Sequence, residues 1–354
     1  MTSISKYFPI SKEIPMDKFV SNLLYNKKYG YYSKKIPFGK NGDFVTAPEI
    51  SFIFSEILAL WVVSFWEYLN KPKIFNLVEL GPGSGRMSLT LIKVFKKFPQ
   101  FFKSTNIFLY EKSKNLKNLQ KKILLGKKVK WISNFENIKS GPVIFLGNEF
   151  FDAIPIKQYE KVNNKYYEKY VRLEKNSKIK PFLQKTNIKT INQLRKLKLL
   201  KNQSFIEYPE QGLKELDLII NVIKRLNGGL ILIDYGFLKQ EGIDTLQSIK
   251  NHKKNIVLNN LGDADITSLV NFNLLKTYFK QKKLKTSTIV TQGFFLKKMG
   301  IVDRAEILSK KMSFKDKSEL YFSLQRLLSP DQMGELFKVI FTFKFKKKFS
   351  TGFI

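Results

Sequence analysis

Short apolar runs alternate with amphipathic stretches along the middle of the chain. The predicted strands are "IFNLVEL" from Ile74, "NIFLYE" from Asn106, "KVKWIS" from Lys128 and "PVIFLGNE" from Pro142. Between them, stretches such as "RMSLTLIKVFKKF" from Arg86 repeat apolar residues at helical spacing. Strands that alternate with helices predict an α/β fold with a doubly wound, Rossmann-like parallel sheet.

A fifth strand is expected further along. "LKELDLIINVIKRLNGG" predicts a helix that Gly228 and Gly229 close, and "LILIDYG" then continues the sheet. "TSTIVTQ" and "LFKVIFTFKFKK" predict strands on either side of a helical segment from Phe294 to Leu328. The sheet is therefore expected to extend almost to the end of the chain.

Residues 1–70 are predicted to be a helical region outside the sheet. In this region "EISFIFSEILALWVVSFWEYL" predicts a long apolar helix from Glu49. Residues 71–354 form the expected α/β domain, with insertions at about 155–210 and 240–335. In the first insertion the pattern alternates around Asn163-Asn164, a two-residue turn signal typical of a β-hairpin.

The composition excludes several kinds of site. The 354-residue chain has no cysteine, which rules out disulfides, thiolate metal sites and cysteine nucleophiles, and one histidine, His252, which disfavours histidine-rich zinc sites. No metal site is expected. The net charge of +34 is typical of nucleic-acid binding, but only six of the 63 basic residues are arginine. We interpret the lysines as solvated surface produced by an AT-rich coding bias.

Membrane and targeting segments are not evident. No apolar segment reaches the ~18 residues needed to span a bilayer. The start, "MTSISKYFPISKEIPMDKF", has no apolar core and no arginine, so it does not resemble a secretory or transit peptide. A cytoplasmic protein is expected.

The stretch "LVELGPGSGRMSLTLI" predicts a cofactor site. A buried strand ends in Glu79, glycines follow at Gly81, Gly83 and Gly85, and a helix begins. Such glycines permit positive φ and allow a ligand to approach the backbone. A dinucleotide fingerprint needs a small residue where Arg86 stands, and Glu79 would repel a pyrophosphate. Glu79 suits the ammonium group of S-adenosylmethionine, although a merely tight turn remains an alternative.

The next strands provide further candidates for cofactor binding. Glu111 ends the second strand, where its carboxylate could accept both ribose hydroxyls, or could simply be solvated. Asn134 and Phe135 follow the third strand and could flank an adenine ring. Asn148, at the end of the fourth strand, is a polar group that is costly to bury unless a ligand pairs with it.

Several motifs in the same order resemble the MidA family of class I methyltransferases, whose mitochondrial member is complex I assembly factor 7. They are "YGYYSKKIPFGKNGDFVTAPEIS", "VELGPGSG", "NEFFDAIPI", "IDYGF", "DTLQ", "ADIT", "TQGFFL" and "MGELFKVI". In the first motif the matching residues are Gly42, Asp43, Phe44, Thr46, Pro48, Glu49 and Ser51. The resemblance covers nearly the whole chain. It implies a seven-stranded methyltransferase sheet with insertions and, for the mitochondrial relative, a protein-arginine activity that supports respiratory complex assembly.

If the acceptor is a guanidinium, the acids of "NEFFDAIPI" acquire a catalytic interpretation. A sulfonium and a guanidinium repel each other by about 4 kcal/mol at 4 Å with an effective dielectric near 20. Glu149 and Asp152 could neutralise this charge, orient the guanidinium bidentately and favour loss of its proton. Phe150 and Phe151 could line a dry slot or stack on the guanidinium. The alternative is that both acids only cap the following turns.

The loop with Thr46, Pro48 and Glu49 resembles a lid over the cofactor, with helix capping an equally sufficient explanation. The leading hypothesis is an S-adenosylmethionine-dependent protein methyltransferase that modifies arginine on a respiratory complex I subunit. We expect no specific nucleic-acid partner, and a homodimer is left open. The alternatives are an RNA methyltransferase, which the net charge favours, and an assembly chaperone that binds the cofactor without turnover.

Overall fold

The computed structural model describes two compact units. The described residues are 6–9, 11–37, 39, 42–43, 45–174, 178–201, 203–239, 242–345 and 348–354. The hairpin unit comprises Met1–Phe44, Phe151–Leu216 and Phe237–Tyr278, and the sheet unit comprises Val45–Phe150, Asp217–Gly236 and Phe279–Ile354. Phe44, one of the motif matches, lies outside the described residues. The expected boundary near residue 70 and the expected insertions stay a prediction.

The sheet unit alternates strands with helices. Its first half contains α3 (Ala47–Ile50), α4 (Phe52–Tyr68), β2 (Phe75–Leu80), α5 (Arg86–Phe95), α6 (Pro99–Ser104), β3 (Thr105–Tyr110), α7 (Lys114–Ile123), β4 (Lys130–Ile132), the 3-10 helix η1 (Phe135–Asn137) and β5 (Val143–Asn148). Its second half contains most of α9 (Glu210–Leu226), β10 (Gly228–Phe237), β15 (Lys285–Thr286), β16 (Val290–Thr291), α11 (Gln292–Lys298), α12 (Ile301–Ser309), α13 (Phe314–Leu328), α14 (Met333–Leu336) and β17 (Phe337–Phe343).

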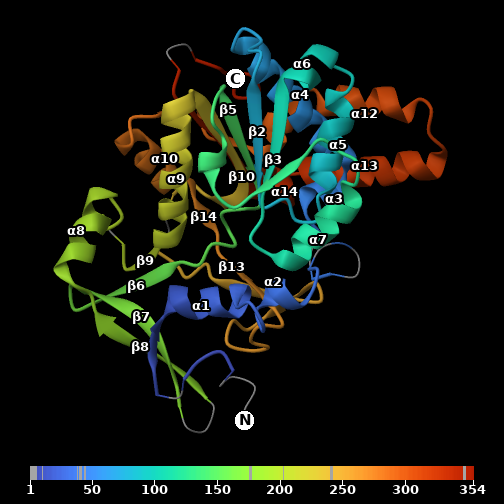
Figure 1. The fold of residues 1–354 in the computed structure, drawn as a ribbon. Coiled ribbons are helices and arrows are strands. Elements are labelled where there is room, and N and C mark those ends of the chain that lie inside the picture. Colours follow the sequence, from blue (N-terminus) through green and yellow to red (C-terminus); the bar gives the residue numbers. More distant parts are fainter. Residues whose placement is uncertain are drawn as a thin grey trace. The chain divides into compact units, whose positions relative to one another are not determined.

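The strands of the sheet unit follow the order β15-β17-β10-β5-β2-β3-β4, and β16 also pairs with β17. The pairs β2–β3, β2–β5, β3–β4 and β5–β10 are parallel, whereas β17 is antiparallel to β10. Figure 1 shows helices on both sides of these strands, with α4 and α5 on one side and α9 on the other. The expected α/β class with a mainly parallel sheet is confirmed.

A cluster of buried apolar residues connects α4 to the sheet. Trp61 and Phe65 of α4 are fully buried, and both pack edge-on against Phe341 of β17 at ring-centroid distances of 5.0 and 5.4 Å. The long helix begins at Phe52, not at Glu49 as expected, because Ser51 has extended backbone (φ −148°, ψ 127°). No helix among the described residues is both long and apolar enough to cross a membrane.

The glycines after α9 do not close that helix, contrary to expectation. Asn227, with φ 54°, follows the last helical residue, and Gly228 already begins β10. A Cβ at Gly228 would lie 2.1 Å from the carbonyl oxygen of Val143, and one at Gly229 would lie 2.4 Å from the ring of Phe341. These glycines are therefore required by close strand packing.

The hairpin unit is built on an antiparallel sheet. Its elements are β1 (Glu13–Pro15), α1 (Met16–Tyr25), α2 (Tyr31–Lys34), β6 (Lys157–Val162), β7 (Lys165–Leu173), β8 (Ile179–Lys185), α8 (Ile188–Lys196), β9 (Phe205–Tyr208), β11 (Gln247–Lys250), β12 (Lys253–Asn255), β13 (Asp265–Thr267), β14 (Val270–Asn271) and most of α10 (Phe272–Gln281). The strand order is β1-β7-β6-β9, with β8 on β7. The expected hairpin is confirmed: Val162 pairs with Lys165, and Asn163 and Asn164 have φ values of 46° and 61°.

We expect Gly228→Ala to lower the free energy of unfolding by about 1–3 kcal/mol, because the new methyl group would overlap a backbone atom that cannot rotate away. Urea denaturation would measure the loss. Asn227→Gly is the control: it keeps positive φ accessible at the neighbouring position and should change the free energy by less than about 1 kcal/mol. A Gly228→Ala protein as stable as the parent would contradict the close-packing explanation.

Candidate active site

The carboxyl ends of β2, β3 and β5 lie at one edge of the sheet. β2 is in parallel register with both neighbours, since Glu79 pairs with Leu109 of β3 and with Leu146 of β5. The polar residues at these ends are Glu79, Glu111 and Asn148. Ligands of open α/β sheets bind outside such carboxyl ends.

The glycine-rich loop after β2 has the conformation that a close-fitting ligand needs. Gly81, Gly83 and Gly85 have φ values of 60°, 55° and 86°, in the region that favours glycine. A Cβ at Gly81 would lie 3.1 Å from the ring of Phe150, so this ring lies against the loop. α5 begins at Arg86, and its first backbone N–H groups have no partner within the helix.

Glu79 is an incompletely paired acid. It is 1% exposed, and its Oε2 accepts a hydrogen bond from the hydroxyl of Ser88 on α5. Its Oε1 is buried and has no hydrogen-bond partner among the described residues. Burial raises the pKa of the Glu79 carboxyl to about 8; the Ser88 hydrogen bond opposes this rise and the charge of Glu111 adds to it. The group can therefore gain or lose its proton near neutral pH.

Glu111 is held by hydrogen bonds from two directions. Its Oε1 accepts from the backbone N–H of Ser113 at 2.8 Å, and its Oε2 accepts from the amide of Gln120 at 3.2 Å. Burial raises the pKa of Glu111, while these hydrogen bonds and the charge of Lys117 oppose the rise. The carboxylate is fixed in orientation at the end of β3.

Asn134 and Phe135 have local roles in the structure. The side-chain oxygen of Asn134 accepts from the backbone N–H of Glu136 at 2.8 Å and caps η1. The ring of Phe135 is 4% exposed and packs against Tyr110 and Phe145 at 4.6 and 5.3 Å. That they flank an adenine stays a prediction.

The end of β5 is strained at Glu149. This residue has φ 49°, which is uncommon for a side chain larger than glycine. Its Oε1 accepts from the backbone N–H of Ala47 and from the side-chain amide of Asn148, both at 3.1 Å. The other end of that amide, Asn148 Oδ1, is buried with no hydrogen-bond partner among the described residues. Glu149 therefore attaches the start of α3 to the end of β5.

The short helix α3 also contacts the glycine turn. Glu49 accepts a hydrogen bond from the hydroxyl of Ser84, and its Oε2 lies 3.0 Å from Nε of Arg86. Glu49 is 10% exposed at the side chain, whereas Arg86 is 64% exposed. Thr46 and Pro48, on either side of Ala47, are half-buried. The segment from Thr46 to Glu49 thus contacts both the end of β5 and the glycine turn. That it is a lid over the cofactor stays a prediction.

Asp152 and Phe151 belong to the hairpin unit. Asp152 is 6% exposed, and its backbone oxygen accepts from the N–H of Ser268 at 3.1 Å. Burial and the charge of Asp152 raise the pKa of nearby Asp265 to about 7, opposed by the hydrogen bond from Tyr32 at 3.1 Å. Two buried carboxyls, Asp152 and Asp265, thus share one neighbourhood.

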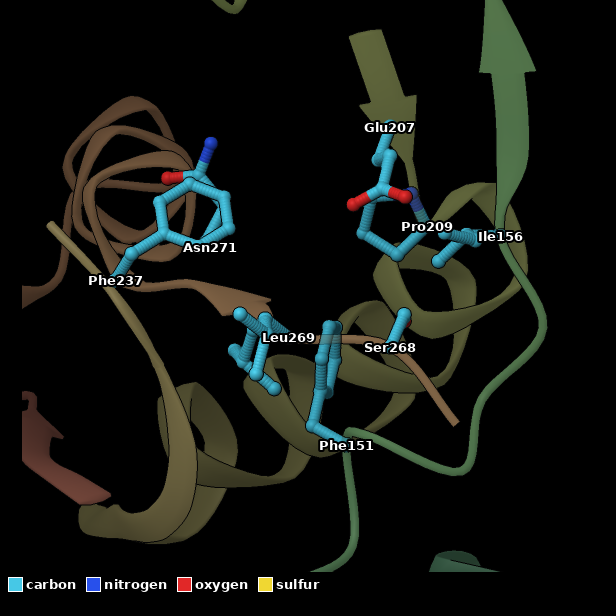
Figure 2. Close-up of a pocket in the computed structure, with 9 residues that line it drawn as sticks. Phe151, Ile156, Glu207, Pro209, Phe237, Ser268, Leu269 and Asn271 are labelled. Atoms are coloured by element: carbon cyan, nitrogen blue, oxygen red, sulfur yellow. The ribbon is translucent and has the colours of Figure 1, made fainter. Parts of the chain in front are cut away.

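A small pocket in the hairpin unit is lined mainly by apolar side chains. Figure 2 shows Phe151, Phe237 and Leu269 around it, with the carboxylate of Glu207 at one side. Both oxygens of Glu207 are already paired with Thr245, at 2.9 Å from its N–H and 2.6 Å from its hydroxyl. None of the glycine-loop residues lines this pocket.

A protein-family model described as "Putative S-adenosyl-L-methionine-dependent methyltransferase" matches residues 57–290. The match covers most of the chain and includes the glycine loop and the ends of β3 and β5. The chain belongs to this methyltransferase family. The expected family membership, enzyme class and cofactor, S-adenosylmethionine, are therefore confirmed.

The methyltransferase resembles curated relatives over nearly its whole length. It is 30% identical over 351 residues to "Protein arginine methyltransferase NDUFAF7, mitochondrial" of Xenopus tropicalis, covering 92% of this chain and 81% of that protein. For the Homo sapiens protein of the same name, identity is 28% over 362 residues, covering 92% and 78%. The cytoplasmic expectation is wrong by this comparison, because these relatives are named as mitochondrial proteins.

The fold of the methyltransferase is shared with solved structures. A Burkholderia thailandensis protein bound to S-adenosyl-homocysteine has a TM-score of 0.79 at 21% identity, covering 97% of this chain and 89% of that one. A native crystal structure from the same organism also has a TM-score of 0.79 at 21% identity, covering 96% and 90%.

The residues at the cofactor edge fit S-adenosylmethionine. Its amino group donates hydrogen bonds and is cationic, and two buried acceptors, Glu79 Oε1 and Asn148 Oδ1, have none of the described residues as a hydrogen-bond partner. A Cβ on Gly81 or Gly85 would crowd Phe150 or Gln120. When bound, the cofactor supplies an electrophilic methyl group.

Sequence reasoning missed three contributors to this edge. They are Ser88, which bonds Glu79; Ser84, which bonds Glu49; and Gln120, which bonds Glu111. Only Gln120 had a usable signal, since it is a polar residue on the buried side of α7, four positions after Leu116, where helical spacing predicts an apolar residue.

Cofactor binding should depend on pH through Glu79. The ionised carboxylate suits an ammonium group, and the pKa of Glu79 in the ligand-free protein is about 8. The affinity for S-adenosyl-homocysteine should therefore rise from pH 6 to 8 and then level off. The rise should be at most about tenfold per pH unit. Calorimetry across this range would measure it, and Glu79→Gln should bind more weakly with a flat profile.

The same substitution should stabilise the free protein at high pH. Between the model-compound pKa of 4.5 and the folded value of about 8, the folded state binds more protons than the unfolded state, so stability falls as pH rises through this window. Glu79→Gln abolishes this loss, and its advantage over the parent should appear at pH 8 but not at pH 4. Identical pH profiles for the two proteins would exclude Glu79 as the titrating group.

Opening of the lid should become easier in Glu49→Ala, which loses the contacts to Ser84 and Arg86. Since the Arg86 pair is largely exposed and such pairs contribute at most about 1 kcal/mol, S-adenosyl-homocysteine should dissociate about three- to tenfold faster. Stopped-flow displacement would measure the rate. Arg86→Gln should have the smaller effect; if neither variant changes the rate, the segment does not gate exchange.

Proposed function

We propose that this methyltransferase methylates arginine on a protein substrate, and that the substrate is a subunit of a respiratory complex. The names of the curated relatives support arginine as the acceptor. The observation that carries the proposal is a pair of acids in one motif: Glu149 at the end of β5, and Asp152 three residues later. A cationic acceptor needs such acids, whereas the phosphates of an RNA substrate would be repelled by them.

The proposed roles follow from charge and hydrogen bonding. Glu79 and Asn148 bind the amino group of the cofactor, and Glu111 binds the ribose. Glu149 and Asp152 accept hydrogen bonds from the guanidinium and orient its planar nitrogens. As a guanidinium nitrogen forms its bond to the methyl carbon, the sulfur–methyl bond breaks and the nitrogen releases one proton.

Asp265 of the hairpin unit is an acid that can exchange a proton near neutral pH. Asp265 has a pKa of about 7 beside Asp152, because burial and the second carboxyl both disfavour its ionised form. A group with a pKa near the working pH is the most effective acid or base.

The two phenylalanines between Glu149 and Asp152 also have proposed roles. Phe150 lies against Gly81 of the cofactor loop, and Phe151 lies 2.6 Å from where a Cβ of Gly212 would stand. We infer that Phe150 excludes water beside the transferring methyl group and that Phe151 holds the start of the following turn. The sheet order β15-β17-β10-β5-β2-β3-β4 supports our further inference that these seven strands are the methyltransferase core.

Neither nucleic acid nor a second copy of the chain is needed for the proposed reaction. Nucleic acid is proposed to bind only weakly and with steep salt dependence, as expected for solvated lysines. A homodimer is not required by the proposed chemistry, because the cofactor edge is built from one chain; sedimentation would establish the oligomeric state.

Glu149→Gln should reduce methyl transfer to a complex I subunit by about 10²-fold or more, because it removes one charge while its amide oxygen can still accept from Ala47. Cofactor affinity, measured in parallel by calorimetry, should stay within about threefold. Asp152→Asn should act in the same direction, and the two losses should be non-additive if both acids hold one guanidinium.

Three outcomes separate the hypotheses. Unchanged transfer in Glu149→Gln would make that acid purely structural. Robust cofactor binding by the parent protein with no transfer to any protein or RNA would favour the assembly chaperone. Transfer to RNA that both substitutions leave intact would favour the RNA methyltransferase.

A further inference from the structure

Gln120 joins three parts of the cofactor edge with one amide group. It lies on α7 and is fully buried. Its Nε2 donates to the carbonyl oxygen of Gly83 at 2.9 Å and to Oε2 of Glu111 at 3.2 Å. Its Oε1 accepts from the indole N–H of Trp131 at 2.9 Å. All of these residues belong to the sheet unit.

The orientation of this amide is fixed by chemistry. The indole N–H of Trp131 can only donate, so it must meet the amide oxygen. The carbonyl of Gly83 and the carboxylate of Glu111 can only accept when the latter is ionised, so both must meet the amide nitrogen. If the amide were flipped, its NH₂ group would face the indole N–H of Trp131 and its oxygen would face the two other oxygens. The network therefore has a single arrangement.

This arrangement leaves Glu111 ready to accept further hydrogen bonds. Ser113 and Gln120 each take one site on a different carboxylate oxygen, at 2.8 and 3.2 Å. The backbone of Lys112 donates a third hydrogen bond to this carboxylate. An ionised carboxylate has about four acceptor sites, so three donors still leave room for a ligand hydroxyl. The hydrogen bonds from Ser113 and Gln120 also fix the plane of the carboxylate. Without them, a flexible side chain at the end of a strand would rotate freely.

The packing around Gln120 shows that the position is built for this side chain. A Cβ on Gly85 would lie 3.3 Å from Cγ of Gln120, so the glycine loop passes directly over the side chain. A leucine could fill the same space in this apolar stripe without needing partners. The polar side chain therefore has a task beyond filling volume.

We propose that Gln120 is a positioning residue that makes Glu111 selective for the ribose diol, so that the enzyme discriminates ribonucleoside from deoxyribonucleoside forms of its cofactor. This inference rests on the cofactor assignment but not on arginine as the acceptor. Gln120 acts through Glu111 and through the carbonyl of Gly83; it need not touch the ligand itself.

The test compares S-adenosyl-homocysteine with its 2′-deoxy analogue by calorimetry in four proteins. The parent should prefer the ribonucleoside by about tenfold or more, the effect of one hydrogen bond to a charged group. In Gln120→Leu this preference should fall to about twofold or less, while affinity for the deoxy analogue changes little. Trp131→Phe, which removes only the donor that orients the amide, should give an intermediate preference.

Asn118→Leu is the matched control, because it removes an amide from the exposed face of the same helix and should leave the preference unchanged. If Gln120→Leu weakens both ligands equally, the residue is merely structural and the proposal is wrong. If Gln120→Leu does not fold, an undiminished preference in Trp131→Phe overturns it instead. Failure of the parent to bind S-adenosyl-homocysteine would contradict the cofactor assignment, a result distinguishable from either.

Discussion

The burial of the Glu79 carboxyl is the constraint on which the cofactor edge depends. An acid that is 1% exposed, with one serine as partner and a second acid close by, is destabilised in its ionised form. The fold tolerates this because the free protein can keep the group protonated. A bound cation would compensate the charge, so the ligand and the edge of the sheet stabilise each other. The positive-φ glycines and the bare helix start of α5 bring backbone close enough for that ligand.

A short segment before α4 connects the glycine turn that follows Glu79 to Glu149 at the end of β5. Glu49 contacts the glycine turn, and two residues earlier the N–H of Ala47 contacts Glu149. Neither contact is strong alone, yet both require the same backbone conformation, which the extended residue Ser51 makes possible by interrupting the helix. The strain at Glu149 is therefore retained in a place where its carboxylate has a defined partner. The glycine turn and the end of β5 are therefore linked through this segment.

The sequence predicted the fold class well because strand and helix periods differ clearly between residues 71 and 240. The two-residue turn at Asn163-Asn164 was equally readable. The end of α9 could not be predicted in the same way. In the sequence Gly228 resembles the end of a helix, and only the backbone of the neighbouring strand shows why this residue must be glycine. The interruption at Ser51 was hidden because an apolar run continues on both sides of it.

At the site, acids at strand ends could be located from the order of elements, since carboxyl ends of parallel strands share an edge. Their partners could not, because Ser84, Ser88 and Gln120 are separated from them by 35, 9 and 9 positions and become neighbours only in the folded chain. Asn134 and Phe135 illustrate the reverse difficulty: residues chosen for a ligand already have local capping and packing partners.

The network around Gln120 has an optical consequence. Of the three tryptophans in the chain, Trp61 and Trp66 lie on α4 and are buried in the apolar core, at 0% and 3% exposure. Trp131 alone is half-buried and donates its indole N–H to the amide that holds Glu111. Any change in the charge or hydrogen bonding of that carboxylate therefore alters the surroundings of one indole while the other two stay constant. The protein contains an intrinsic fluorophore whose indole N–H is bonded to the same amide that contacts Glu111.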